Sequence, residues 1–269
     1  MSNLYKTALN NIPFKSITNK CIVLDLDETL VHSNESVPKL QELGIMRDPS
    51  LQDLRNRVYE ISMDDVVYKK GQGIKTEMWG IVRPHVREFL IFCFSYFKVV
   101  AVWSAGKKKY VDAIVDFLFK DIRRPHVIYA RDQCERTTDN VLTKPLEKMM
   151  KQELGLNKYM GLENVFMLDD RDSVCIPNPY NGIQIPAYAP DFNARSLRSD
   201  DIRLKQLMTW LLRPEVMNSH DVRDLDKSGV FNTDVTTMVD QPIDYNVLNY
   251  ITSGDAERIS TIRPIGVKN

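Results

Sequence analysis

The sequence predicts an α/β fold in which a parallel sheet carries helices on both faces. Short apolar runs rich in β-branched residues, typical of buried strands, alternate along the chain with amphipathic stretches typical of helices. The chain length agrees, because 269 residues suit one α/β domain with appendages or two small domains. Apolar residues make up 43% of the chain, which is enough for a hydrophobic core.

The first part of the chain predicts a strand followed by an insertion. Residues 1–19 are expected to form an irregular arm, and residues 20–26 a buried strand. Residues 34–80 are expected to form a small helix-plus-flap insertion. Before Val58 the apolar residues partly follow helical spacing, and beyond it extended segments around Gly71-Gln72-Gly73 predict a β-hairpin.

The middle of the chain predicts two further helix–strand pairs. Residues 83–94 should form a helix with Pro84 in its first turn, where the missing N–H costs nothing. Residues 98–103 and 126–130 should be strands. Residues 107–120 predict an amphipathic helix whose apolar face comprises Tyr110, Ala113, Ile114, Phe117 and Leu118.

The last predicted elements complete the sheet. Residues 144–154 should form a helix ended by Gly155, because glycine commonly terminates helices. Residues 164–170 predict a core strand, residues 182–185 a further strand, and residues 200–212 a closing helix.

Residues 213–269 are polar, with scattered serine, threonine, asparagine and aspartate. This composition leaves two interpretations open: a disordered tail, or an extended arm that becomes ordered on a protein partner. The predicted domain therefore covers residues 20–212.

Composition argues against several classes of protein, although a local basic patch stays possible. The chain has 36 lysines and arginines and 36 aspartates and glutamates, so its net charge is zero, and we expect no direct binding to nucleic acid. The 4 cysteines show no Cys-x-x-Cys spacing, which argues against a zinc site. Three of them, Cys21, Cys93 and Cys175, lie in or beside apolar segments typical of core thiols. We therefore expect an intracellular, reducing compartment, the nucleus or the cytoplasm.

Targeting and membrane signals are weak. The segment MSNLYKTALN lacks the apolar core of a signal peptide. The apolar stretch FLIFCFSYFKVVAVWSA is interrupted by Ser95 and Lys98 and is too short to cross a bilayer, so we expect no association with a membrane.

The segment CIVLDLDETLVHS, residues 21–33, is the most informative part of the sequence. Four apolar residues lead into Asp25, which is followed by Asp27 and Thr29. Two carboxylates at the end of a buried strand repel each other, which should drive their pKa values apart. They make chemical sense if one acid attacks, the other transfers protons and a metal ion holds them together. The ordinary alternative is an Asx-type turn with Thr29 capping the next helix.

Other predicted strand ends and loops carry polar groups too. In a parallel sheet, active sites form beyond the carboxyl ends of the strands. Ser104 follows one strand, Asp169 and Asp170 end another, and Lys144 lies in a loop. Each alone has an ordinary interpretation: a turn serine, a solvated lysine or loop acids. Together they supply a nucleophile, a hydroxyl, a cation and carboxylates for a metal.

The order of these residues resembles the haloacid-dehalogenase (HAD) superfamily of phosphatases. The closer resemblance is to the RNA polymerase II C-terminal-domain phosphatases and the NLI-interacting-factor-like phosphatases. It rests on LDLDETLVHS, RPHVREFL, WSAGKKKYVDAIVDFL, YARDQC, Lys144 and LDDRDS, and it covers residues 20–212. The resemblance implies a Rossmann-like (HAD) sheet and a Mg²⁺-dependent phosphatase.

The resemblance also implies a role for each residue. Asp25 would be the nucleophile that forms an aspartyl-phosphate. Asp27 would protonate the leaving hydroxyl and then activate water, and Thr29 would orient it. Ser104 would bind the phosphoryl oxygens, and Lys144 would offset the negative charge.

The implied metal site uses further acids of the same set. Mg²⁺ would be bound by Asp170, the carboxylate of Asp25 and the backbone carbonyl of Asp27. Asp169 would position Lys144.

Residues Lys107, Lys108 and Lys109 break a local rule, because cations at a helix N-terminus oppose the helix dipole. A nearby anion would compensate them, which favours an acidic or multiply phosphorylated substrate. The alternative is a solvated positive face. Weaker candidates for the same role are Arg83, Arg87, Arg131, Arg136 and Arg171.

The absence of a large inserted domain predicts an open site and hence a phosphoserine or phosphothreonine protein as substrate. Compact relatives bind a substrate proline with aromatic residues between positions 121 and 143, where this chain offers only His126 and Tyr129. Two alternatives remain: a phosphatase-like scaffold or binding protein within a larger assembly, with residues 213–269 as its partner-binding arm, and a small-molecule phosphatase. Relatives in large DNA viruses leave a viral origin open.

Overall fold

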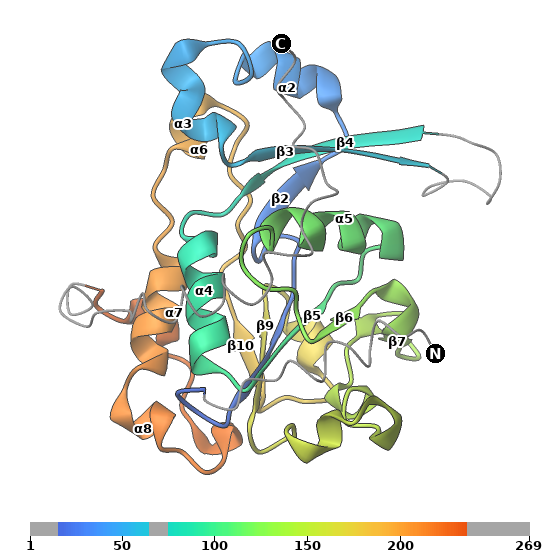
Figure 1. Ribbon diagram of the computed structural model, residues 1–269, viewed down its shortest axis with the longest axis vertical. Coiled ribbons are helices and arrows are strands. Elements are labelled where there is room, and N and C mark those ends of the chain that lie inside the picture. Colours follow the sequence, from blue (N-terminus) through green and yellow to red (C-terminus); the bar gives the residue numbers. More distant parts are fainter. Residues whose placement is uncertain (1–15, 65–74, 236–269) are drawn as a thin grey trace.

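The computed structural model describes residues 16–64 and 75–235 (Figure 1). Most of the predicted N-terminal arm, the predicted turn at Gly71-Gln72-Gly73 and the part of the predicted tail beyond residue 235 lie outside the described residues.

A parallel sheet of five strands forms the centre of the domain, in the order β10-β9-β1-β5-β6. The first strand lies in the middle, where Cys21 pairs with Val99 on one side and Val165 on the other. Because all the strands run the same way, their carboxyl ends meet at one edge. The strands are β1 (Cys21–Leu24), β5 (Val99–Trp103), β6 (Val127–Tyr129), β9 (Val165–Asp169) and β10 (Gly182–Gln184).

The two faces of the sheet are covered differently. Ile22 and Leu24 of β1 point into a core shared with α4 (Val86–Tyr96), α5 (Lys108–Leu118) and α7 (Arg203–Leu211). Cys21 and Val23 point the other way, into a core closed by three short 3₁₀ helices. These are η3 (Leu146–Lys148), η4 (Gln152–Leu154) and η5 (Leu156–Lys158). The predicted parallel sheet with helices on both faces is confirmed.

The predicted helix over residues 144–154 is wrong, because η3 and η4 replace it. Pro145 lies before η3, and the Asn178 side chain binds this segment from another part of the chain, donating to the Lys144 carbonyl and accepting from Leu146 N–H. Gly155 does end η4 in the left-handed conformation, with φ of 69°.

Two local predictions about helices also need correction. Helix α4 begins at Val86 after His85, so Pro84 precedes the first turn instead of occupying it. On α5, Phe117 is 37% exposed. The buried face of α5 comprises Tyr110, Val111, Ile114, Val115 and Leu118.

The insertion and the segment just before it form a second sheet, here called the insertion sheet, which is antiparallel, ordered β2-β4-β3, and lies beyond α5 (Figure 1). Its strands are β2 (Val31–Asn34), β3 (Val58–Asp64) and β4 (Lys75–Val82), and β3 with β4 makes the predicted hairpin. The predicted helical part contains α2 (Val37–Leu43), η1 (Pro49–Leu51) and α3 (Gln52–Arg55).

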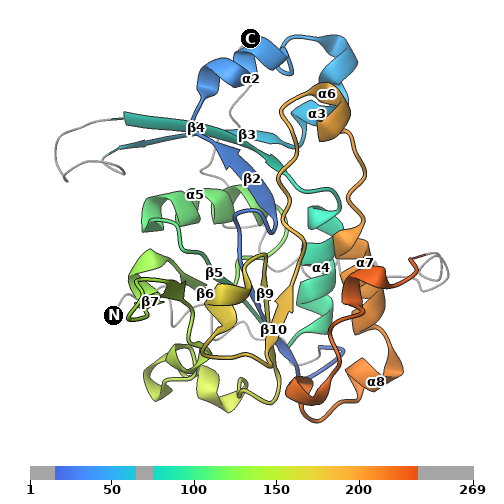
Figure 2. The same ribbon diagram turned by 180° about the vertical axis from the view of Figure 1, so that it is seen from behind.

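The insertion sheet has its own small core. Leu40, Leu54 and Trp79 pack there with Tyr188 and with Leu197 of α6 (Ala194–Leu197). Figure 2 shows α6 lying beside α3. The insertion is therefore anchored to the segment that follows β10.

The packed region continues past residue 212, the predicted end of the domain. Helix α8 (Pro214–Met217) and two 3₁₀ turns, η7 (Val222–Asp224) and η8 (Val230–Asn232), lie against the core. Val216, Val222 and Val230 are at most 1% exposed. The first part of the predicted polar tail, up to residue 235, thus belongs to the folded domain, because its few apolar residues have a core to enter.

All 4 cysteines are free thiols; Cys21 and Cys93 are buried, and Cys134 and Cys175 are half-buried. Within the described ranges, no helix has the length and apolar character needed to cross a membrane.

Candidate active site

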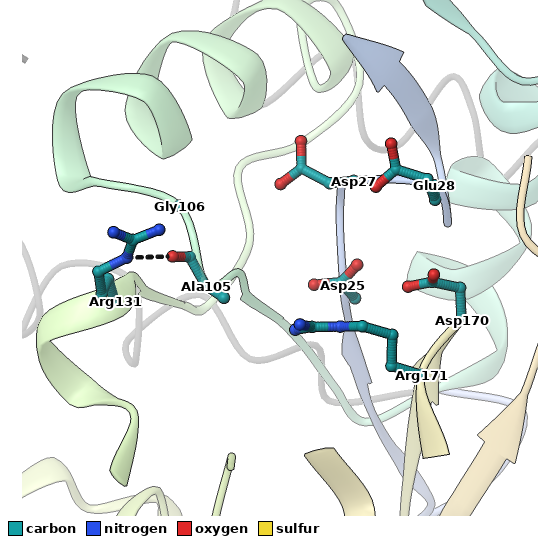
Figure 3. Close-up of a pocket in the computed structure, with 8 residues that line it drawn as sticks. All are labelled: Asp25, Asp27, Glu28, Ala105, Gly106, Arg131, Asp170 and Arg171. Carbon is teal, nitrogen blue, oxygen red and sulfur yellow. Dashed lines mark hydrogen bonds between the residues drawn. The ribbon is translucent and has the colours of Figure 1, made fainter. Parts of the chain in front are cut away.

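A cleft of about 230 Å³ opens at the carboxyl edge of the central sheet (Figure 3). Its walls come from the segments after β1, β5, β6 and β9, as expected for a parallel sheet. The lining residues are Asp25, Asp27, Glu28, Ala105, Gly106, Arg131, Asp170 and Arg171.

Asp25, Lys144 and Asp169 form a buried ionic cluster beneath the cleft. The Lys144 ammonium lies 2.6 Å from Asp25 Oδ1 and 2.6 Å from Asp169 Oδ2. Asp25 follows β1 and Asp169 ends the adjacent strand β9, and Asp25 N–H donates to the Leu168 carbonyl. Burial alone would lower the pKa of Lys144, but the charges of the two carboxylates outweigh it and raise that pKa. The lysine is therefore a fixed cation beside Asp25.

Asp27 is held by two hydroxyl groups. Ser104 Oγ donates to Asp27 Oδ2 at 3.1 Å, and Tyr110 OH donates to Asp27 Oδ1. Burial and the charge of Asp25 nevertheless raise the pKa of Asp27 to about 6. A carboxyl group with such a pKa can carry a proton near neutral pH, as a general acid must.

Thr29, expected to orient Asp27, does not contact it through a hydrogen bond. Its side chain is fully buried, and within the described part of the chain its Oγ1 has no hydrogen-bond partner. The Thr29 backbone carbonyl instead accepts from Arg83. Tyr110 makes the hydrogen bond to Asp27 that was expected of Thr29, and a part for Thr29 in orienting Asp27 stays a prediction. The sequence offered one signal for it, since a tyrosine on a buried helix face usually needs a partner for its hydroxyl.

Asp25, Asp169 and Asp170 could hold a metal ion, because one carboxylate oxygen from each lies within 4.8 Å of the others. Both oxygens of Asp169 are engaged, Oδ2 by Lys144 and Oδ1 by the Arg171 N–H at 3.0 Å. Asp25 and Asp170 therefore remain, and carboxylate oxygens suit Mg²⁺. Burial and the charge of Asp25 raise the pKa of Asp170, so a cation here would relieve repulsion.

Among the predicted metal ligands, Asp27 directs its carboxyl group toward Ser104 and Tyr110 and does not join the acidic cluster. Its backbone carbonyl as a ligand stays a prediction.

Among the residues that line the cleft, two arginines supply the positive charge, and a contribution of Lys107, Lys108 and Lys109 stays a prediction. Lys108 pairs with Asp112 along α5 at 2.6 Å. Arg131 donates to the Ala105 carbonyl at 2.7 Å, and Arg171 extends beside Asp25 (Figure 3).

Two of the other arginine candidates serve elsewhere. Arg83 is buried in an ion pair with Asp201, and Arg136 binds Asn140.

The fold is of the HAD type. Its parallel sheet carries Asp-x-Asp after the central strand, a serine after a neighbouring strand and paired acids at the end of another, with a buried lysine beside them. The sequence profile of the NLI interacting factor-like phosphatases matches residues 20–223, and the chain belongs to this family.

Similar proteins come from several kinds of organism. Phosphatase PSR1 of Saccharomyces cerevisiae is 28% identical over 66% of this chain and 34% of its own length. A probable C-terminal domain small phosphatase of Dictyostelium discoideum is 28% identical over 66% of this chain and 47% of its own. The putative CTD phosphatase-like protein 355R of Invertebrate iridescent virus 3 is 25% identical over 64% of this chain and 86% of its own.

The chain thus spans less than half the length of the first two relatives. Among solved structures, Fcp1, an essential RNA polymerase II CTD phosphatase, superposes with a TM-score of 0.51 at 19% identity, covering 70% of this chain and 46% of that one. This likeness concerns the fold alone.

Proposed function

We propose that this protein is a Mg²⁺-dependent phosphatase that hydrolyses phosphoserine or phosphothreonine in proteins through an aspartyl-phosphate. One observation carries the proposal: Asp25 faces the cleft with a lysine fixed behind it and a second carboxyl group, Asp27, of raised pKa beside it. A nucleophile, a cation and a proton donor are the three groups that phosphoryl transfer to a carboxylate requires.

The residues divide the chemistry as follows. The carboxylate of Asp25 attacks phosphorus, and Asp27 gives its proton to the leaving oxygen. Asp27, now ionised, then takes a proton from the water that hydrolyses the aspartyl-phosphate. Lys144 offsets the charge on Asp25, and Asp169 positions Lys144. Asp25 and Asp170 would hold Mg²⁺, which supplies further positive charge to the phosphoryl group.

The walls of the cleft support a phosphoprotein as substrate. Arg131 and Arg171 stand at its sides, and guanidinium groups bind phosphate and carboxylate oxygens well. Among the described residues, none that lines the cleft is aromatic, and both His126 and Tyr129 are buried beneath the surface. A phosphorylated segment with acidic neighbours therefore suits the cleft better than one recognised through a proline.

The test is hydrolysis of p-nitrophenyl phosphate and of phosphoserine peptides, with Mg²⁺ or with a chelator, by wild type and Asp25→Asn. We expect Mg²⁺-dependent turnover that the variant loses while keeping its thermal stability. Turnover by Asp25→Asn at the wild-type rate would rule out the aspartyl-phosphate. A folded but inactive wild type would favour the scaffold. Activity on metabolites but not on peptides would favour the small-molecule phosphatase.

A further inference from the structure

A chain of three hydroxyl groups runs from the insertion sheet to Asp27. Tyr110 OH, on α5, donates to Asp27 Oδ1. Ser33 Oγ, on β2, lies 2.5 Å from Tyr110 OH and 2.7 Å from Tyr59 OH, on β3. The chain thus links residues 27 and 59 through side chains from three different elements.

The direction of the protons along this chain follows from the chemistry of hydroxyl groups, each of which has one proton to donate. Tyr110 uses its one proton in the hydrogen bond to Asp27, so in the hydrogen bond between Ser33 and Tyr110 the donor must be Ser33. Tyr59 must then donate to Ser33. Every hydrogen bond points toward the carboxyl group, and each strengthens the next.

The far end of the chain is fixed by packing. Tyr59 is 5% exposed and lies over Gly80 of the neighbouring strand, where a Cβ atom would come within 2.2 Å of its hydroxyl oxygen. Its ring also packs on Phe117 of α5 at 5.2 Å between centroids. The glycine opens the space that the tyrosine fills, so the Tyr59 hydroxyl has little freedom to leave Ser33.

The other donor to Asp27 has a second task. Ser104 Oγ accepts from Gly106 N–H at 2.9 Å and has one proton to give, which goes to Asp27. If Ser104 binds a phosphoryl oxygen, as the sequence analysis expects, that proton must turn from Asp27 to the phosphoryl group. Tyr110 is then the hydroxyl that keeps Asp27 in place while the phosphoryl group is transferred.

We propose that Tyr110, Ser33 and Tyr59 are positioning residues that aim the proton of Asp27 at the leaving oxygen, so that the insertion sheet supports the acid of the active site. This inference rests on the proposed function. It assigns the insertion a part in proton transfer, in addition to shaping the site.

The experiment measures release of the leaving group in the first turnover by wild type and Tyr110→Phe. The substrates are p-nitrophenyl phosphate, phenyl phosphate and a phosphoserine peptide. In this order the leaving oxygen becomes more basic and depends more on receiving a proton. General acid catalysis contributes on the order of 10²–10⁴-fold where the leaving group needs it. We expect Tyr110→Phe to slow release from the peptide by about tenfold or more and from p-nitrophenyl phosphate by less than about threefold.

Two sets of variants control this measurement. Tyr96→Phe removes a buried hydroxyl at the C-terminal end of α4, which donates to the Leu211 carbonyl at 2.6 Å. This variant should leave the dependence on leaving group unchanged. Ser33→Ala and Tyr59→Phe should change the dependence on leaving group in the same direction as Tyr110→Phe. The double variant should slow release from the peptide by less than the two single effects combined, because both residues act through one chain.

An equal slowing of all three substrates by Tyr110→Phe, or an effect no larger than that of Tyr96→Phe, would overturn the inference while leaving the phosphatase itself intact. A crystal structure of Tyr110→Phe gives a second readout that needs no activity. We expect the Asp27 carboxyl group to leave its wild-type position in this variant, and an unmoved carboxyl group would also overturn the inference. An inactive wild type would count against the proposed function alone.

Discussion

Lys144 places its ammonium group between two buried carboxylates, and the chemistry of the cleft depends on this arrangement. Asp25 is 5% exposed and Asp169 is 1% exposed, and burying carboxylates to this extent costs free energy unless a cation lies close by. The same lysine that would promote attack on phosphorus therefore also stabilises the fold at the carboxyl edge of the sheet.

Removal of this cation should destabilise the protein strongly. Lys144→Met leaves Asp25 and Asp169 buried without their shared cation, and breaking a buried ion pair costs about 3–5 kcal/mol. Urea unfolding at pH 7 measures the loss, and adding Asp169→Asn should recover part of it. Lys108→Met is the matched control, because its exposed pair with Asp112 contributes about 0.5 kcal/mol or less. Equal losses in both lysine variants would contradict the prediction.

Asp27 should make stability depend on pH. The fold raises its pKa from 3.8 to about 6, so between these values the folded protein keeps a proton that the unfolded chain has lost. Stability must then fall as pH rises through this window. Asp27→Asn cannot ionise, so it should exceed wild type in unfolding free energy at pH 8 by at most about 3 kcal/mol.

Urea titrations at several pH values, with chelator present, check this sign: the advantage of Asp27→Asn should shrink toward pH 4. An advantage that grows at low pH would show that Asp27 is stabilised in its charged form.

Most of the site could be predicted at the residue scale, because its side chains follow strands whose ends must meet. Asp25, Ser104 and Asp170 lie near one another for this reason, and their order along the chain is informative. Tyr110 could not be assigned in the same way. Its position on a buried helix face says that its hydroxyl needs a partner, but only packing decides that the partner is Asp27.

The insertion sheet illustrates how an element depends on a single glycine. Gly80 of β4 faces Tyr59 of β3 in register, and an added Cβ would also lie 2.7 Å from the His32 carbonyl on β2. Both neighbouring strands therefore approach too closely for a side chain at this position.

Gly80→Ala should accordingly lower the free energy of unfolding by about 1–3 kcal/mol, the usual cost of overpacking. Gly229→Ala is the matched control, because a Cβ there meets nothing within 4 Å and φ is −93°, so its effect should stay within about 0.5 kcal/mol. Thermal unfolding followed by circular dichroism distinguishes the two. An unchanged midpoint in Gly80→Ala would mean that β3 can move away at no cost.

The type of an element could be predicted where hydrophobic periodicity determines it. It could not be predicted where contacts with side chains distant in sequence determine it. The buried strands β1, β5 and β9 were expected from their apolar runs, within two residues at each end. The segment after Lys144 has helical composition but is held as 3₁₀ turns by Asn178, a residue more than thirty positions away. No local pattern contains that contact.

At the scale of the whole molecule, the sheet and its covering layers follow from the alternation of strands and helices, but the end of the domain does not. Residues beyond 212 are mostly polar, and the sequence leaves the fate of their few valines open. In the structure α7 offers them a surface: Arg203 donates to the Phe231 carbonyl, and Gln206 donates to the Thr233 carbonyl. The apolar stretches of α4 and α7 together create the place where these residues pack.

A chain shortened to end at Leu212 should therefore be much less stable than one that ends at Val235. The shorter chain loses Val216, Val222 and Val230, and burying a valine contributes about 1.5–3 kcal/mol. It also leaves Lys20 without the carbonyls of residues 217 and 219 that its ammonium contacts.

The summed loss, about 5 kcal/mol or more, is a large part of the 5–15 kcal/mol that stabilises an ordinary domain. We expect the chain ending at Leu212 to aggregate, or to unfold at a much lower temperature than the chain ending at Val235, which keeps every one of these contacts. Soluble yield and thermal unfolding of the two chains measure the difference. Equal midpoints would show that the core closes without this segment and would restore residue 212 as the end of the domain.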